Sequence, residues 1–562
     1  MIIVALPKLM QGQCSDVYDT MSAEGCNHYE WQGRVLTTSG NYDDTVANAV
    51  AGGCDSLLTL RLTIYRCITP PNPDNMDSSQ CVKMLDAREW SIQNSWSSGG
   101  GVSNHNTPMV GDLDDDGVPD IMCFGSSGEH DNNGLRDCTV LVYDGITKRQ
   151  KANFRMPVYV TAYDAGAYGL VKLPSRKGLI IMAGIDCYLR AFDITSANPA
   201  TPYWTSNEPY GTGNQFAVNV SFADFNNDGH PEIVVRNKIF DAATGVLLAT
   251  TTGGNNTGAS YAHYSHRTGR TLYSPMVANL LGDDRQELIL GNEIYDIRIT
   301  NRSGTAGNSA TLIKRINPPT SVVQDGHAQV ADFNLDGHLD IFVSNKDVVG
   351  GGGTVSMYVW DVHNNRTSPA VRIPCNMSGK SLPLIANIDT DDNLEVTIQC
   401  AASGVGNQRV RTYKYNAASN QFDFMWGIGV DEDSYSNGMT AFDFNLDGVN
   451  EMLICDQSTM RVVNGAGQVM NSFRFSETTI MQYPVIADVD CDGHAEVVSV
   501  GSGRLNIFKS SGQPWAPARS VWNQYMYNIT CVNNDLTVPR YYYFLIGARR
   551  FVPIRGPPQI AV

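Results

Sequence analysis

Seven short acidic loops recur along this chain, and each stands between two apolar runs of strand length. Their pattern is D-x-[DN]-x-D-G-x-x-[DE], with oxygen donors at positions one, three, five and nine and a glycine at position six. Glycine lets the backbone reverse because it adopts positive φ at little cost. Carboxylate and amide oxygens around such a turn are the ligands that calcium prefers, as in the EF-hand loop. The pattern therefore predicts calcium loops, here framed by strands rather than helices.

Five loops match the whole pattern. Their predicted metal ligands are Asp112, Asp114, Asp116 and Asp120; Asp224, Asn226, Asp228 and Glu232; Asp332, Asn334, Asp336 and Asp340; Asp443, Asn445, Asp447 and Glu451; and Asp488, Asp490, Asp492 and Glu496. Two copies are weaker. The loop at Asn387 keeps Asp389, Asp391 and Glu395 as candidate ligands, whereas the loop at Asn279 has a leucine at position three and no glycine at position six. We expect about five to six calcium ions; the alternative for any single loop is a solvated acidic turn.

The loops also define a repeat. They begin at residues 112, 224, 279, 332, 387, 443 and 488, and most lie about 55 residues apart. The first interval is about twice as long, so a unit without acids is expected between residues 121 and 223, in the run 168–193 with its turn PSRKG. All-strand repeats of this length are typical of β-propeller blades. We predict an all-β fold, a propeller of eight four-stranded blades, with seven as the alternative. The last unit shows three obvious strands, so a segment such as 89–96 or a C-terminal one must complete it.

Over roughly residues 100 to 510 the chain resembles the FG-GAP / VCBS repeat family, whose calcium-loop blades also build the head of integrin α subunits. The Asp-rich loops carry this resemblance. The Phe-Gly and Gly-Ala-Pro elements that name the family are mostly absent, and integrin-type propellers have seven blades. The resemblance implies calcium-binding blades of an extracellular protein with a role in adhesion.

Four regions are expected. Residues 1–65 form a small β-module, 66–84 a turn-rich linker, 85–530 the propeller and 531–562 a C-terminal tail. The first region is similar to a repeated module of large secreted proteins of gliding-type bacteria, on Tyr29, Trp31, Gly33 and the run Cys54 to Ser56. We therefore expect an exported protein, extracellular or at the cell surface, whose leader is not visible in this chain.

The composition excludes some classes of binding partner. The net charge of −17 argues against nucleic acid, and six calcium ions would offset twelve of those charges. No apolar run reaches membrane-spanning length. The 13 cysteines allow disulfides in an exported protein, or free buried thiols in strands, as at Cys123, Cys187, Cys400 and Cys455.

A ligand is expected on the propeller face opposite the calcium loops. The candidate residues there are Tyr261, His263, Tyr264 and His266, and other links on this face contain Tyr210 and His327. Aromatic rings beside polar groups suit sugars or peptides, although ordinary loop packing would use the same residues. The histidines at loop position seven, His230, His338 and His494, are expected to offer the loop only their backbone.

We therefore expect a non-enzymatic calcium-binding propeller of an exported surface protein, which mediates adhesion or binds an extracellular glycan or protein. No nucleophile elbow, HExxH motif or Ser-His-Asp spacing stands out in the sequence. The first alternative is a carbohydrate-active enzyme, because some polysaccharide lyases are eight-bladed calcium propellers. The second is a structural spacer.

Overall fold

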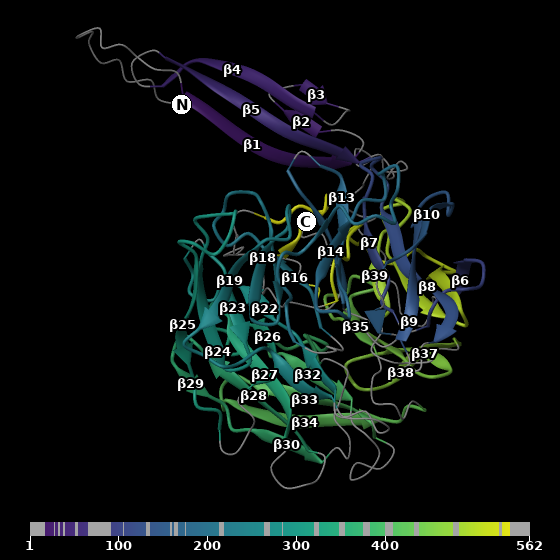
Figure 1. The fold of residues 1–562 in the computed structure, drawn as a ribbon. Helices are drawn as coiled ribbons and strands as arrows, with labels where there is room; N and C mark the ends of the chain where they lie inside the picture. The colour runs from purple at the N-terminus through teal and green to yellow at the C-terminus, as the bar shows by residue number, and fades with distance from the viewer. Residues whose placement is uncertain are drawn as a thin grey trace. The chain divides into compact units, whose positions relative to one another are not determined.

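The computed structural model divides the chain into two compact units, Met1–Met76 and Asp77–Val562. It describes residues 17–26, 29–31, 34–36, 40–50, 54–65, 92–104, 106–130, 135–157, 160–161, 167–174, 176–212, 218–262, 270–283, 285–319, 325–347, 354–374, 383–399, 408–431, 438–475, 483–525, 527 and 531–539. The regular elements in these ranges are all β-strands (Figure 1). None of the described residues belongs to a helix with the length and apolarity needed to cross a membrane.

The first unit is a small β-module. Its strands are β1 (Val17–Cys26), β2 (Tyr29–Trp31), β3 (Arg34–Leu36), β4 (Gly40–Val50) and β5 (Cys54–Tyr65). β5 lies between β1, with which it pairs in parallel, and the antiparallel β4, while β2 and β3 form a separate hairpin. Leucine alternates with exposed Arg61 along β5, so Leu60 and Leu62 pack with Trp31 and Leu36 in one core.

The second unit consists of strand groups, which we number 1 to 8 in chain order. Groups 1 to 4 contain β7 (Met109–Gly111), β8 (Asp120–His130), β9 (Leu135–Asp144) and β10 (Gln150–Arg155), with β11 (Val160–Thr161) beside β9; β12 (Tyr168–Lys172), β13 (Gly178–Ala183), β14 (Leu189–Phe192) and β15 (Trp204–Thr205); β16 (Ser221–Ala223), β17 (Glu232–Val235), β18 (Lys238–Asp241) and β19 (Leu247–Thr252); and β22 (Met276–Ala278), β23 (Glu287–Leu290), β24 (Glu293–Arg298) and β25 (Ser309–Arg315). A hairpin of β20 (Ala259–Ala262) and β21 (Arg270–Tyr273) lies between groups 3 and 4 in the sequence.

The remaining groups repeat this plan. Groups 5 to 8 contain β26 (His327–Ala331), β27 (Asp340–Asp347), β28 (Thr354–Asp361) and β29 (Arg366–Thr367), with β30 (Val371–Pro374) beside β28; β31 (Leu384–Ala386), β32 (Glu395–Gln399), β33 (Val410–Asn416) and β34 (Gln421–Ile428); β35 (Met439–Phe442), β36 (Glu451–Cys455), β37 (Thr459–Val463) and β38 (Val469–Arg474); and β39 (Val485–Ala487), β40 (Glu496–Gly501), β41 (Arg504–Ser510) and β6 (Ile92–Ser97). Each group is an antiparallel sheet, and groups 3 and 4 are joined by parallel pairing of β19 with β25.

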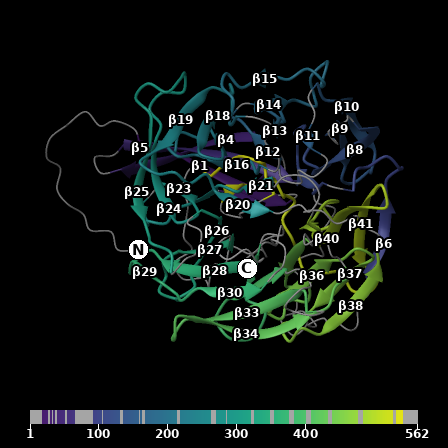
Figure 2. The ribbon, with the colours of Figure 1, turned by 60° about the horizontal axis from the view of Figure 1, so that its bottom comes forward.

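Figure 2 shows the strand groups following one another around a common centre in chain order. The first strands of the groups, such as β16 and β39, are buried along their whole length, whereas fourth strands such as β25 consist mostly of exposed and half-buried residues. The burial of the first strands explains the short, continuous apolar runs before each loop, because a strand covered on both faces needs apolar residues throughout. The predicted all-β propeller class is therefore observed; that the eight groups are eight separate blades stays a prediction.

Two sequence-based expectations about the strand groups are confirmed. Group 2 occupies the interval expected to hide a unit without acids, and its turn between β12 and β13 contains the predicted PSRKG segment. The last group is completed from the N-terminal side, because β6 pairs with β41 over Ile92 to Ser97. This pairing gives β41 a partner on its otherwise open edge.

The described residues of the segment 515–538 pack against the first strands of several groups. Trp522 and Val110 exchange two backbone hydrogen bonds, and the Asn523 carbonyl accepts the N–H of Leu170 at 2.7 Å. Further along, the Leu536 carbonyl accepts the N–H of Lys172 at 2.9 Å. Within the predicted tail 531–562, the described residues 531–539 include Leu536, which is fully buried in the core. The segment therefore links groups 1 and 2, which belong to separate sheets.

We expect Leu536→Ala to lower the free energy of unfolding by about 2–5 kcal/mol, because it removes a fully buried side chain that packs on the backbone at Gly111. Denaturant unfolding measures the change. The matched control is Leu281→Ala, at a leucine that is 50% exposed, with an expected change within about 0.5 kcal/mol. Equal effects of the two variants would show that the C-terminal segment does not contribute to the core.

Candidate metal loops and a surface hollow

All seven acidic loops share one closing contact. The carboxylate at position nine begins the second strand of its group and accepts the backbone N–H of position two. The distances are 3.0 Å from Leu113 to Asp120, 2.9 Å from Phe225 to Glu232, 2.8 Å from Leu280 to Glu287, 3.0 Å from Phe333 to Asp340, 2.9 Å from Ile388 to Glu395, 3.1 Å from Phe444 to Glu451 and 2.9 Å from Val489 to Glu496. The two weak copies therefore close in the same way as the five full ones.

The five full loops add a second contact. The carboxylate at position one accepts the N–H of the glycine at position six, at 2.7–3.1 Å. Position five then accepts the N–H of position seven, as Asp336 does from His338 at 2.9 Å. Acid oxygens come within 4.8 Å of one another in the loops at Asp112, Asn387 and Asp488. Among the described residues, the acids of the loops at Asp224, Asp332 and Asp443 form no group of three at that spacing, so the predicted convergence is observed in three loops.

The backbone is left-handed at two positions of each full loop, although the pattern indicated only one. Glycine at position six has φ between 81° and 88°. Position four is left-handed too, and it holds Asp115, Asn227, Leu335, Leu446 and Cys491. Asp and Asn tolerate this conformation, which explains two of the five residues. Leu335 at φ 63° and Leu446 at φ 60° adopt it although a leucine side chain makes no local hydrogen bond that would offset its cost. In the weak loop at Asn279, Gly282 occupies this same position with φ 73°.

Burial shifts the acidity of these carboxylates. Burial raises the pKa of Asp340 to about 8, and the charge of nearby Asp361 adds to the shift. Burial likewise raises the pKa of Glu451 to about 8 and that of Asp488 to about 7, with contributions from neighbouring acids. A raised carboxyl pKa means that the ionised form is unfavourable there at neutral pH. A cation in the loop would remove this cost.

Unpaired oxygens support the fit of a hard cation. Asp112 Oδ1, Asp340 Oδ1 and Asp488 Oδ1 are buried and have no hydrogen-bond partner among the described residues. A buried carboxylate oxygen without a donor is costly unless it binds a positive charge. The donor sets contain only oxygen, which suits calcium better than zinc or copper. The described residues thus fit the predicted ion.

Basic side chains form ion pairs with the acids of several loops, and the sequence analysis did not predict these pairs. Lys151, Lys414 and Lys509 place their ammonium groups among the acids of the loops at Asp112, Asn387 and Asp488. Arg302, from the segment after β24, reaches Asp228 at 3.1 Å and Glu232 at 3.4 Å. The sequence does not mark them without the strand register: Lys414 pairs directly with Glu395 across the sheet, and Phe508, beside Lys509, pairs with Val497, the residue after Glu496.

Two of the histidines at loop position seven, His338 and His494, have side-chain contacts outside their loops. His494 Nδ1 lies 2.8 Å from the Trp515 carbonyl oxygen, and His338 stacks on His363 with 4.0 Å between the ring centroids. Their N–H groups, by contrast, bond to position five. This arrangement agrees with the expectation that these residues offer the loop their backbone.

The predicted ligand residues Tyr261, His263, Tyr264 and His266 have side chains outside the described residues, so their role stays a prediction. Two other aromatic positions of the same expected face are core residues instead. Tyr210 is 1% exposed and donates its hydroxyl hydrogen to the Gly184 carbonyl, and His327 is 3% exposed. Ordinary packing accounts for both.

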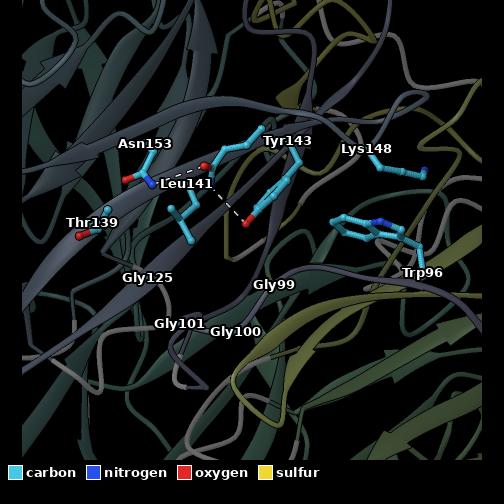
Figure 3. Close-up of a pocket in the computed structure, with 11 residues that line it drawn as sticks. Trp96, Gly99, Gly100, Gly101, Gly125, Thr139, Leu141, Tyr143, Lys148 and Asn153 are labelled. Atoms are coloured by element: carbon cyan, nitrogen blue, oxygen red, sulfur yellow. Dashed lines mark hydrogen bonds between the residues drawn. The ribbon is translucent and has the colours of Figure 1, made fainter.

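A hollow of about 580 Å³ lies where group 8 meets group 1 (Figure 3). Trp96 of β6 stands edge-on to Tyr143 of β9 with 5.6 Å between the ring centroids. Along the other side, Asn153 donates to Gln150, and Gln150 donates to the Tyr143 hydroxyl. Figure 3 shows Lys148 beside Trp96, and the glycines Gly99, Gly100 and Gly101 form one rim. Aromatic faces, amides and glycine backbone are suited to a polar ligand with apolar C–H surfaces.

No protein-family model matches this chain, and the search of curated proteins also finds no match. Among solved structures, the chain is similar to the V. cholerae biofilm matrix protein Bap1, at 14% identity and a TM-score of 0.54, covering 84% of this chain and 99% of that one. It also matches quinohemoprotein alcohol dehydrogenases from Pseudomonas putida HK5 (10% identity, TM-score 0.43, 77% and 78% covered) and Comamonas testosteroni (12%, 0.42, 76% and 78%). At these identities, likeness shows the fold alone: a β-propeller type.

The expectation that the chain is not an enzyme is corrected by these matches. They include quinohemoprotein alcohol dehydrogenases, and a fold does not by itself settle function. The matches assign no activity to this chain.

Gly337→Val tests the loop backbone. Space around Gly337 is open, so the expected loss of about 1–2 kcal/mol in the free energy of unfolding comes from the φ of 88° alone. The control is Gly99→Val, also in open space but without a positive φ, which should change stability by less than about 0.5 kcal/mol. Denaturant unfolding of both variants decides; no difference between them would show that the loop does not need glycine's backbone freedom.

Proposed function

We propose that this chain is a calcium-binding β-propeller of the FG-GAP / VCBS type, part of an exported surface protein, and that it binds an extracellular glycan. The observation that carries the binding role is the hollow at Trp96. A partly exposed indole there stands beside amide and hydroxyl groups, the combination that stacks on a sugar ring and pairs with its hydroxyls. Lys148 also lines the hollow, and its ammonium donates to the Gly145 carbonyl.

Calcium has a structural part in this proposal. Each full loop joins the buried first strand of its group to the second strand, and the carboxylates on that turn repel one another unless a cation lies between them. An ion that binds the folded loop and not the unfolded chain stabilises the fold by mass action. The hollow uses strands of groups 8 and 1, so its shape depends on those sheets being formed.

The melting temperature should fall in EDTA and recover with excess calcium but not with sodium. Each occupied loop should contribute about 2.7 kcal/mol when calcium is at about 100 times its dissociation constant. Asp336→Ala removes one ligand from the loop at Asp332 and should reduce the calcium-induced shift without abolishing it. Scanning calorimetry measures both effects. A melting curve that is the same in EDTA and in calcium would remove calcium from the proposal.

A glycan array tests the hollow. Trp96→Ala should weaken binding at least about tenfold, because it removes the aromatic platform, with calcium-dependent melting unchanged. The control is Tyr203→Ala, an exposed aromatic of group 2 that does not line the hollow. The double variant Tyr264→Ala, His266→Ala tests the face predicted from sequence. If only this double variant loses binding, the ligand lies there instead; release of ultraviolet-absorbing products from an acidic polysaccharide would identify a lyase.

A further inference from the structure

Three loops bring their acids unusually close together. One ligand oxygen from each of Asp488, Asp490, Asp492 and Glu496 lies within 4.8 Å of the others, and the same holds for three acids of the loop at Asp112 and three of the loop at Asn387. Carboxylates repel one another, so such convergence needs a positive charge between them. In each of these loops a lysine supplies it.

The lysines make ion pairs on several sides at once. Lys509 Nζ lies 2.8 Å from Asp490, 2.6 Å from Asp492 and 3.0 Å from Glu496. Lys151 Nζ repeats the arrangement at 3.0, 2.7 and 2.9 Å from positions three, five and nine of the loop at Asp112. Lys414 contacts Asp389, lies 2.6 Å from Asp391 and is 3.7 Å from Glu395. In every case the ammonium meets the carboxylates of positions three, five and nine.

Loop composition varies with the presence of the lysine. The three lysine loops have an acid at position three, namely Asp114, Asp389 and Asp490. The other full loops have asparagine there. In those loops the amide nitrogen donates to the carboxylate of position five, at 3.0 Å for Asn226, 3.1 Å for Asn334 and 3.0 Å for Asn445. An extra negative charge is thus present where a lysine faces it and absent elsewhere.

The lysines are held in place by the strands that carry them and by partial burial. Their side chains are 17–28% exposed, and Lys414 and Lys509 project from third strands of their groups. By contrast, no described Lys or Arg forms an ion pair with Asp332, Asp336 or Asp340.

We propose that Lys151, Lys414 and Lys509 are resident cations that occupy the place of calcium in their loops, so that groups 1, 6 and 8 form without metal. Groups 1 and 8 flank the hollow and meet where β6 completes the last sheet. That junction would therefore be independent of calcium, and the calcium requirement would fall on loops of the Asp332 kind. Only the calcium requirement of those remaining loops rests on the proposed function.

Counting bound ions tests the proposal. Full-length protein is stripped with EDTA, equilibrated with calcium and assayed for metal by mass spectrometry. Lys509→Met and Lys414→Met replace the ammonium by an uncharged side chain of similar length, and each should bind one calcium ion more than the wild type. The matched control is Lys172→Met, whose ammonium lies 2.7 Å from Asp115 at position four, outside the ligand positions, and it should bind no additional ion. Unchanged counts in both loop variants would overturn the proposal.

The melting temperature in EDTA gives a second test, which does not depend on calcium binding. In EDTA, Lys509→Met should melt a few degrees below Lys172→Met, because its carboxylates lose their counter-charge. Adding Asp490→Asn, which recreates the asparagine at position three, should recover most of that loss. Equal melting of the two single variants, or no recovery in the double variant, would contradict the role of the lysine.

The two readings separate this inference from the proposed function. Wild-type protein that binds no calcium, together with loop variants that bind one ion each, would end the calcium proposal for the other loops and leave the resident lysines supported. Wild-type protein that already binds five or six ions, with no gain in the variants, would show the lysines displaced by calcium and end the inference alone.

Discussion

Buried negative charge at the start of the second strand is the constraint that seven of the eight strand groups share. The acid at position nine must be buried, because it accepts the N–H of position two and thereby fixes the turn between the first two strands. Burial makes its ionised form unfavourable, as the raised pKa values of Asp340 and Glu451 indicate. Every acidic loop therefore needs a compensating positive charge, and the groups differ in where that charge comes from.

Group 2 shows that the fold itself does not require the acids. Its turn contains no carboxylate, yet β12 to β15 form the same antiparallel sheet, with fully buried β13. The apolar first and second strands determine the sheet, and the acidic loop is an addition to it. This explains how single loops could lose a ligand, as those at Asn279 and Asn387 do, while keeping their closing hydrogen bond.

The ring is held together by segments from both ends of the second unit. β6 completes the last sheet from the N-terminal side, and the segment 515–538 lies against the first strands of groups 1 and 2. Both are remote in sequence from the strands that they contact. Closure of this kind couples the groups, so a local change in one loop can be felt at the hollow between groups 8 and 1.

The sequence alone determined what is local. Apolar runs of strand length and the repeat of about 55 residues predicted the all-β propeller type and the hidden second unit, because strands and turns depend on near neighbours. The calcium chemistry of the loops stays a prediction. Only the tertiary structure decided which charge faces each loop. Lys151 comes from the fourth strand of its group, Lys509 from the third and Arg302 from a neighbouring group. The burial of Leu536 and the meeting of Trp96 with Tyr143 likewise depend on contacts between distant segments, which no local pattern records.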